Sequence, residues 1–360
     1  MSLIALEDLS VAVGDFRLDR ISLEAGDGEY LILLGPSGAG KTMLLEVIAG
    51  LRIPDTGTVT INGLDVGGVS PEYRGTGLVY QDYSLFPHMT AAENIAFGLK
   101  LQKKPVKVIQ ERVDTLLADL GISLLKDRYP GSMSGGEQQR VAIARALAPG
   151  PSVLLLDEPF ASLDPRNRDE CMRVMQKLKD TRSITIIQVS HSGEEAYALA
   201  DKVAVLLGGR VVQTGPPDEI FCRPVSLEIA RFVGMENVFT GTVVNSDRGS
   251  SRISIGTAEI QLPATYPPGD QISIGIPAGS IKVVSSQPVL EDPGTNSISC
   301  QVRNVTLGKD TVTIRLEGAI PLTAMVKRIS EEGNIPVPGI KVYAVFKDTD
   351  VQVLSGASLS

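Results

Sequence analysis

The fold of the first part of this chain is indicated by one short stretch, Gly35-Pro36-Ser37-Gly38-Ala39-Gly40-Lys41-Thr42. It matches the pattern G-x-x-x-x-G-K-[ST] of a phosphate-binding loop, in which glycines let backbone N–H groups turn inward around phosphate oxygens. In such a loop Lys41 neutralises the charge of the β- and γ-phosphates, and the Thr42 hydroxyl is a Mg²⁺ ligand. Residues 30–35 form a short apolar run, and residues 41–50 show helical spacing. The loop therefore lies between a predicted strand and a predicted helix, as phosphate binding requires.

A second apolar run, residues 153–156, ends in two carboxylates, Asp157 and Glu158. Two adjacent acids at the end of a strand are by themselves more often solvated turn residues. Beside a phosphate-binding loop they favour catalysis. Asp157 is then predicted to hold the metal through its water shell, and Glu158 to orient or deprotonate the attacking water.

Strand and helix signals alternate along the first 235 residues. Further strand signals lie at residues 59–61, 77–80, 184–189 and 203–207, and helical patterns lie at 137–147 and 166–178. This alternation predicts an α/β sheet with crossover helices. The interval from about 87 to 147 has helical patterns without a convincing strand, which predicts a helical subdomain inserted into the α/β core.

Composition and charge exclude several other classes of protein. The 360 residues are 43% hydrophobic and 21% charged, as in ordinary globular proteins, and no apolar run is long enough to span a bilayer. Because 42 acidic residues outnumber 34 basic ones, we expect no nucleic-acid partner. The three cysteines are odd in number and far apart, and no two have metal-ligand spacing, so neither a disulfide framework nor a zinc site is expected.

After residue 236 the pattern changes to short alternating runs separated by Gly, Pro, Asn and Asp. This change predicts an all-β domain over residues 236–360. The domain also repeats itself, because the pattern of residues 242–255 recurs at 301–314 and that of 281–283 recurs at 351–353. We therefore expect two similar β lobes.

The order of motifs in the first 235 residues resembles the nucleotide-binding subunit of an ATP-binding-cassette (ABC) transporter. The motifs are the phosphate-binding loop, Gln81, Ser134-Gly135-Gly136, Leu156-Asp157-Glu158, Ser162-Leu163-Asp164 and His191. The resemblance implies an α/β P-loop NTPase with an inserted helical subdomain (1–235), which hydrolyses ATP with Mg²⁺. It also implies a homodimer, since Ser134, Gly135 and Gly136 of that family cap the γ-phosphate of ATP bound by the other subunit. Hydroxyl and N–H groups at a helix N-terminus make an anion site, although alone they would only cap the helix.

The resemblance also assigns roles to single residues. His191 matches the histidine that contacts the γ-phosphate and positions the water and Glu158, although a lone histidine at a strand end is more often structural. Gln81 matches the catalytic and Mg²⁺-binding glutamine that links nucleotide state to the helical subdomain, and Asp164 belongs to the nucleotide-binding motifs. Val13 aligns with the aromatic residue that stacks on adenine, so Phe16 becomes the candidate for that role.

Two further features concern partners. Residues 83–89 resemble the surface that receives a permease coupling helix, although such an aromatic cluster could equally be a small core patch. The C-terminal domain resembles the OB-like, TOBE/Mop-like accessory domains of importer ATPases, and its second lobe is similar to molybdate- and tungstate-binding modules. In those modules a Ser or Thr and a Lys help to hold the oxyanion, which implies Ser297 and Lys347, with support from Thr295 and Ser299. Solvated loop residues are the alternative for each.

Together these resemblances imply a peripheral ATPase at the cytoplasmic face of the cell membrane. It would drive integral membrane permease subunits that import molybdate or tungstate delivered by an extracytoplasmic oxyanion-binding protein. The C-terminal domain is expected to sense the oxyanion and inhibit transport. The alternatives are an ABC importer ATPase for iron, polyamine, sugar or sulfate, and a non-transport ABC ATPase, which usually has coiled-coil insertions or tandem cassettes.

Overall fold

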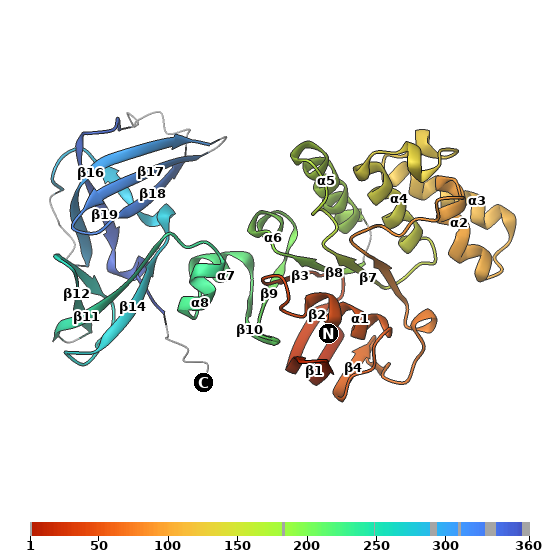
Figure 1. Cartoon of the computed structure of the whole chain (residues 1–360), viewed down its shortest axis with the longest axis horizontal. Helices are drawn as coiled ribbons and strands as arrows, with labels where there is room; N and C mark the ends of the chain where they lie inside the picture. Colours follow the sequence, from red (N-terminus) through yellow and green to blue (C-terminus); the bar gives the residue numbers. More distant parts are fainter. Residues whose placement is uncertain are drawn as a thin grey trace. The chain divides into compact units, whose positions relative to one another are not determined.

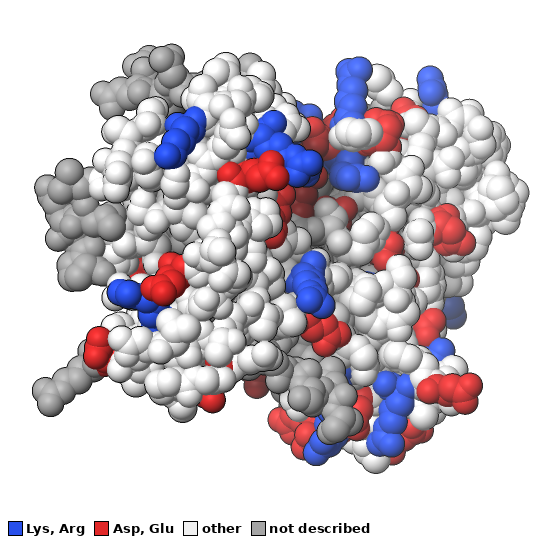
Figure 2. All heavy atoms as spheres, turned by 60° about the vertical axis from the view of Figure 1, so that its left-hand side comes forward, with Lys and Arg blue, Asp and Glu red and all other residues white. Residues whose placement is uncertain are grey.

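The structure is a computed structural model that describes residues 2–181, 184–247, 249–288, 294–308, 311–327 and 336–354. It divides into two compact units, Met1–Pro217 and Asp218–Ser360 (Figure 1). The domain boundary expected from the sequence, at 235/236, stays a prediction. Among the residues described, no helix is both long and apolar enough to cross a membrane. Basic and acidic side chains are interspersed in small groups on the face drawn in Figure 2.

A six-stranded sheet organises the first unit. Its order is β10-β9-β3-β8-β7-β6, in which only β10 runs antiparallel to its neighbour. The strands are β3 Tyr30–Leu34, β6 Thr76–Val79, β7 Val153–Asp157, β8 Thr185–Ser190, β9 Lys202–Leu207 and β10 Arg210–Gly215. Every residue of β3, β7 and β8 is buried, as expected where both faces of a parallel sheet are covered. The predicted α/β sheet is confirmed.

A second, antiparallel sheet of order β2-β1-β4-β5 completes this α/β part. Its strands are β1 Ser2–Val13, β2 Phe16–Gly26, β4 Thr56–Ile61 and β5 Leu64–Asp65. Helix α1, Lys41–Ala49, shares one hydrophobic core with both sheets, to which Leu6, Leu44 and Leu155 contribute. The core therefore fixes the start of α1 against the ends of the central strands.

The described residues 80–152, between β6 and β7, contain helices and connecting loops but no strand. The helices are α2 Ala91–Leu101, α3 Val106–Asp119, α4 Gly135–Leu147 and the 3-10 turns η2 Ser123–Leu125 and η3 Pro130–Ser132. Both α2 and α4 begin with a capping box, in which side chain and backbone of residues three apart bond reciprocally. The other elements of the unit are η1 Pro71–Tyr73, α5 Pro165–Thr181 and α6 Gly193–Leu199.

Two short helices, α7 Pro217–Cys222 and α8 Leu227–Phe232, precede two five-stranded antiparallel sheets. The first sheet has the order β13-β12-β11-β14-β20 and the second β18-β17-β16-β19-β15. Their bounds are β11 Asn237–Asp247, β12 Ser250–Ile255, β13 Ala258–Leu262, β14 Gln271–Ile276, β15 Lys282–Val284, β16 Thr295–Leu307, β17 Thr311–Gly318, β18 Leu322–Lys327, β19 Lys341–Lys347 and β20 Gln352–Leu354. The 3-10 turns η4 Ala278–Ser280 and η5 Asp348–Asp350 precede β15 and β20.

The two sheets have the same strand order, so the predicted pair of similar lobes is confirmed. The last strand of each repeat pairs with the sheet of the other repeat. Strand β15 pairs with β19 of the second lobe, and β20 pairs with β14 of the first. The repeated segments 281–283 and 351–353 overlap these two exchanged strands. Side chains of both sheets form a single core.

Two buried asparagines join the lobes in a matching way. Asn237 at the start of β11 donates to the Thr323 carbonyl at 2.8 Å and accepts from the Thr323 N–H at 2.7 Å. Asn296 near the start of β16 accepts from the Gln261 N–H at 2.8 Å and donates to its carbonyl at 3.2 Å. Each side-chain amide thus binds both the N–H and the carbonyl of one residue in the edge strand of the opposite lobe, as a residue of a neighbouring strand would.

We expect Asn237→Ala to lower the free energy of unfolding of the β unit by about 1–3 kcal/mol, because it removes a buried amide and leaves the partly buried N–H and carbonyl of Thr323 without that partner. Asn245→Ala, at an exposed position of the same strand, is the matched control and should change it by less than about 0.5 kcal/mol. Calorimetric melting of the full chain measures both. Equal melting curves for the two variants would show that the amide does not join the lobes.

Candidate active site

The phosphate-binding loop lies between β3 and α1, where the sequence predicts it. Gly40, directly before α1, has a φ of +96°, and a Cβ there would lie 2.6 Å from Leu18 and 2.8 Å from Phe16. Glycine is required because it alone tolerates this conformation and this space. Lys41 is buried, and its Nζ donates to the Gly35 carbonyl at 2.7 Å. The ammonium therefore lies at the loop that is suited to phosphate.

Two of the predicted Mg²⁺ ligands, Thr42 and Asp157, meet at the carboxyl end of β7. The Thr42 hydroxyl donates to both carboxylate oxygens of Asp157 at 3.0 Å. Burial raises the pKa of Asp157, while the bond from Thr42 acts in the opposite direction. Burial lowers the pKa of Lys41, and the nearby acids Glu158 and Asp157 oppose that shift. A carboxylate that is costly to bury and close to a hydroxyl is a site where a divalent cation would relieve the cost.

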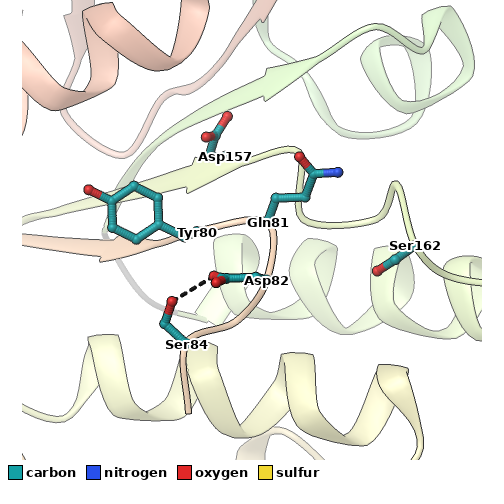
Figure 3. A pocket seen from close by; sticks show the side chains of 6 residues that line it. All are labelled: Tyr80, Gln81, Asp82, Ser84, Asp157 and Ser162. Atoms are coloured by element: carbon teal, nitrogen blue, oxygen red, sulfur yellow. Dashed lines mark hydrogen bonds between the residues drawn. The ribbon is translucent and has the colours of Figure 1, made fainter.

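Gln81 lines the same cavity as Asp157, which has a volume of about 570 Å³. Figure 3 shows the Gln81 amide and the Asp157 carboxylate projecting in the same direction, whereas Asp82 turns back to accept from Ser84 at 2.6 Å. The described residues contain no cluster of three or more His, Cys, Asp or Glu side chains that could hold a metal ion. Hydroxyl, carboxylate and amide oxygens nevertheless fit Mg²⁺, which keeps several waters and takes few protein ligands.

The catalytic pair that the sequence predicts is brought together. His191 Nδ1 lies 3.3 Å from Glu158 Oε2. Glu158 has a φ of +43°, and its N–H donates to the Val189 carbonyl at 3.2 Å, so the turn after β7 is tied to β8. This strained backbone holds the carboxylate at the carboxyl edge of the sheet, where it can accept a proton from water.

A buried carboxylate that the sequence analysis missed lies behind His191. Glu195 accepts from the Ser190 hydroxyl at 2.7 Å and from Gln188 Nε2 at 2.8 Å, and Ser190 Oγ accepts from the Ser192 N–H at 3.0 Å. Both neighbours of His191 are thereby held. Burial raises the pKa of Glu195. The spacing Ser-x-x-Glu at 192–195 could have drawn attention to it, but that pattern predicts a helix cap rather than a support for a histidine.

The serine and glycines of the third motif begin α4. Ser134 Oγ accepts from the Glu137 N–H at 3.4 Å, and Glu137 accepts from the Ser134 N–H at 2.7 Å. Glu137 thus completes a capping box with Ser134. Gly136 lies against Asn167 of α5, because a Cβ on it would be 3.4 Å from that side chain. These residues do not line the cavity that contains Gln81 and Asp157.

The remaining nucleotide-site candidates lie nearby or are engaged locally. Phe16 is partly buried against the phosphate-binding loop at Gly40, while Val13, its antiparallel partner, is 42% exposed. The role of Phe16 in stacking on adenine stays a prediction. Asp164 accepts from the N–H and from the side chain of Asn167, and the bond from the N–H lowers the pKa of Asp164. Its carboxylate caps the first turn of α5.

The segment 83–89 is partly packed, like a core patch, and partly exposed, like a binding surface. Tyr83 is buried, and the Phe86 ring packs 4.6 Å from the Phe97 ring of α2, as in a core patch. His88 and Pro87 are exposed, as a contact surface requires. Its docking role stays a prediction.

In the second β lobe, strand register brings the oxyanion candidates to one face. Thr295 pairs directly with Lys347, and Ser297 pairs with Val345. Because side chains alternate along a strand, Thr295, Ser297 and Lys347 share a face. The Lys347 N–H donates to Asp350 at 3.2 Å, so an acidic residue lies close to this face.

Some of the known proteins match about two thirds of this chain or less, and others match almost its whole length. The family described as ABC transporter matches residues 18–161. The molybdate/tungstate import ATP-binding protein WtpC of Pyrococcus horikoshii is 39% identical over 352 residues, which cover 98% of this chain and 99% of that protein. The sulfate/thiosulfate import ATP-binding protein CysA of Mycobacterium bovis is 45% identical over 242 residues, 67% of this chain and 69% of that protein.

A solved structure shares the fold of the first part. It is a dimeric ATP-binding cassette in a post-hydrolysis state bound to ADP and Pi, with a TM-score of 0.54 at 28% identity, and it covers 59% of this chain and 98% of that chain. The phosphate-binding loop, the paired acids and the histidine on an α/β sheet define an ATP-binding ATPase of the cassette type. The chain belongs to the ABC transporter family.

Proposed function

We propose that this chain is the ATP-hydrolysing subunit of an importer for molybdate or tungstate. One observation carries the choice of substrate. Similarity to the molybdate/tungstate import protein extends over 98% of the chain and so includes both β lobes, whereas the match to the sulfate/thiosulfate protein covers 67%. A domain that follows the ATPase and is shared through its whole length supports a shared cargo.

In the proposed reaction two copies of the chain enclose ATP between them. Lys41 and the loop N–H groups of one copy bind the phosphates, and Ser134, Gly135 and Gly136 of the other copy cap the γ-phosphate. Support comes from the exposure of Ser134 and Gly135 at the N-terminus of α4 and from the dimeric state of the similar cassette structure. Hydrolysis would then reopen the pair.

Thr42, Asp157 and Gln81 would hold Mg²⁺, which when bound neutralises charge on the β- and γ-phosphate oxygens. Glu158 would take a proton from the attacking water. His191, 3.3 Å from Glu158, would orient that carboxylate and donate to the γ-phosphate. Phe16 would stack on adenine, and Asp164 would align α5 beside the partner's nucleotide.

The proposed setting is the cytoplasmic face of the cell membrane, where the chain would bind peripherally to integral permease subunits. Residues 83–89 would receive a coupling helix of the permease, since the exposed His88 and Pro87 lie beside the packed Phe86. An extracytoplasmic oxyanion-binding protein would deliver the cargo. Ser297 and Lys347 would bind cytoplasmic oxyanion, since neutral donors and one cation suit a tetrahedral dianion. This binding would inhibit transport.

Proteoliposomes that contain the permease and this chain test the proposal. We expect ATP-driven uptake of molybdate or tungstate to exceed that of sulfate by at least about tenfold, the ratio equivalent to 1.4 kcal/mol. Oxyanion at the ATPase side should lower uptake, and Lys347→Ala should relieve this inhibition. Lys341→Ala, at the other end of the same strand, is the matched control. Faster uptake of sulfate would favour the sulfate alternative, and unchanged uptake at high internal oxyanion would exclude the sensor.

A further inference from the structure

Two consecutive residues after Gln81 have a left-handed backbone although neither is glycine. Tyr83 has a φ of +61° and Ser84 a φ of +43°. Such conformations are unfavourable for residues with a Cβ and persist only where the surroundings impose them. Tyr83 is also 6% exposed, so its hydroxyl is carried into the interior. The contacts that impose this conformation are therefore informative about the segment that carries Gln81.

One of these contacts joins Tyr83 to the segment that follows the catalytic acids. The Tyr83 hydroxyl lies 2.7 Å from Ser162 Oγ. Ser162 is separated from Glu158 by only three residues, and it lines the same cavity as Gln81 and Asp157 (Figure 3). The bond joins the loops that follow the neighbouring strands β6 and β7, and both loops carry residues of the candidate active site.

A second contact fixes the backbone from the other side. Arg145, near the end of α4, donates to the Tyr83 carbonyl at 3.0 Å and to the Ser84 carbonyl at 2.7 Å. Its guanidinium also lies 5.2 Å from the centre of the Phe86 ring. Arg145 thus binds the backbone of this segment, whereas the Tyr83 hydroxyl makes a separate link to the loop that follows the acids.

We infer that Tyr83 is a positioning residue for ATP hydrolysis, which fixes Gln81 relative to Asp157 and Glu158 through its hydrogen bond to Ser162. Loss of this bond would leave the nucleotide-binding loop intact, because Lys41 and Thr42 lie on a different segment. It would let Gln81 move with respect to the acids. Small misplacements of catalytic groups lower the rate of the chemical step more than they lower binding of substrate. The inference rests on ATP hydrolysis by this chain and does not depend on the transported solute.

Steady-state ATP hydrolysis by the purified full chain tests the inference. We expect Tyr83→Phe and Ser162→Ala each to lower kcat by about threefold to tenfold, the rate equivalent of one neutral hydrogen bond, while KM for ATP and Tm stay unchanged. The double variant should be no slower than the slower single variant, because both remove the same bond. Ser162→Thr, which keeps a hydroxyl, should restore most of the rate.

Tyr73→Phe is the matched control, since it removes the hydroxyl of a tyrosine that is 79% exposed, and it should leave kcat unchanged. A wild-type kcat for Tyr83→Phe would overturn the inference. So would a double variant whose loss equals the product of the two single losses. If Tyr83→Phe lowers Tm, the exposed Ser162 decides, and a wild-type kcat for Ser162→Ala then overturns it. An inactive wild-type chain would instead count against the proposed function.

Discussion

Glu158→Gln is expected to lower kcat for ATP hydrolysis by roughly 10²- to 10⁴-fold, the contribution of a general base. The amide keeps the size of the carboxylate and can still bond to His191, but it cannot accept a proton from water. Lys41 and Thr42 are untouched, so ATP should still bind. Phosphate release at saturating ATP and Mg²⁺ measures the rate of hydrolysis. A nucleotide-binding assay under the same conditions shows whether the variant still binds ATP.

The same variant tests whether two copies enclose the nucleotide. If turnover opens the pair, then blocked turnover should cause a dimer to accumulate when ATP is saturating, and light scattering would report a doubled mass. Glu111→Gln, an exposed glutamate of α3, is the matched control and should hydrolyse ATP as the wild type does. A wild-type rate for Glu158→Gln would refute the role of this acid, and a chain that stays monomeric would refute the shared site.

The local motifs could be predicted because their chemistry and their position in the fold coincide. The glycines and Lys41 require a strand-to-helix turn, and Asp157 ends a buried strand, so parallel strands bring these residues to one edge. By contrast, the antiparallel sheet of β1 and β2 escaped prediction. Register shifts between Leu6 and Leu9 and between Leu9 and Val11 interrupt the alternation that would have marked β1 as a strand.

Contacts between distant segments explain what the sequence could not show. The bond between Tyr83 and Ser162 joins residues 79 positions apart, and no sequence pattern of either residue predicts contact with the other. The internal repeat predicted two lobes, but it could not show that β15 and β20 pair with the opposite sheets. A repeat specifies which segments are alike, whereas strand pairing depends on which sheet edges lie beside each other in the folded domain.

Asp157→Asn is expected to slow Mg²⁺-dependent hydrolysis strongly and at the same time to stabilise the nucleotide-free chain. Burial raises the pKa of Asp157, so the fold disfavours its ionised form. At pH 8 the carboxyl is nevertheless ionised, at a cost in stability. A neutral amide can accept from Thr42 without that cost. The gain in Tm should be of the order of 2–4 °C for each kcal/mol relieved. The loss of rate should exceed roughly 100-fold, because a metal ligand disappears with the charge.

The sign of the pH dependence separates this cause from others. A carboxyl whose pKa is raised by folding destabilises the native state at high pH, and the penalty disappears as pH falls through the raised pKa. The difference in Tm between Asp157→Asn and the wild type should therefore be positive at pH 8 and shrink toward zero at lower pH, in calorimetric scans without Mg²⁺ and ATP. Asp169→Asn, on the exposed face of α5, controls for the loss of one charge. A gain that grows as pH falls would contradict burial as the cause, because protonation of a buried carboxylate can only diminish the benefit of replacing it.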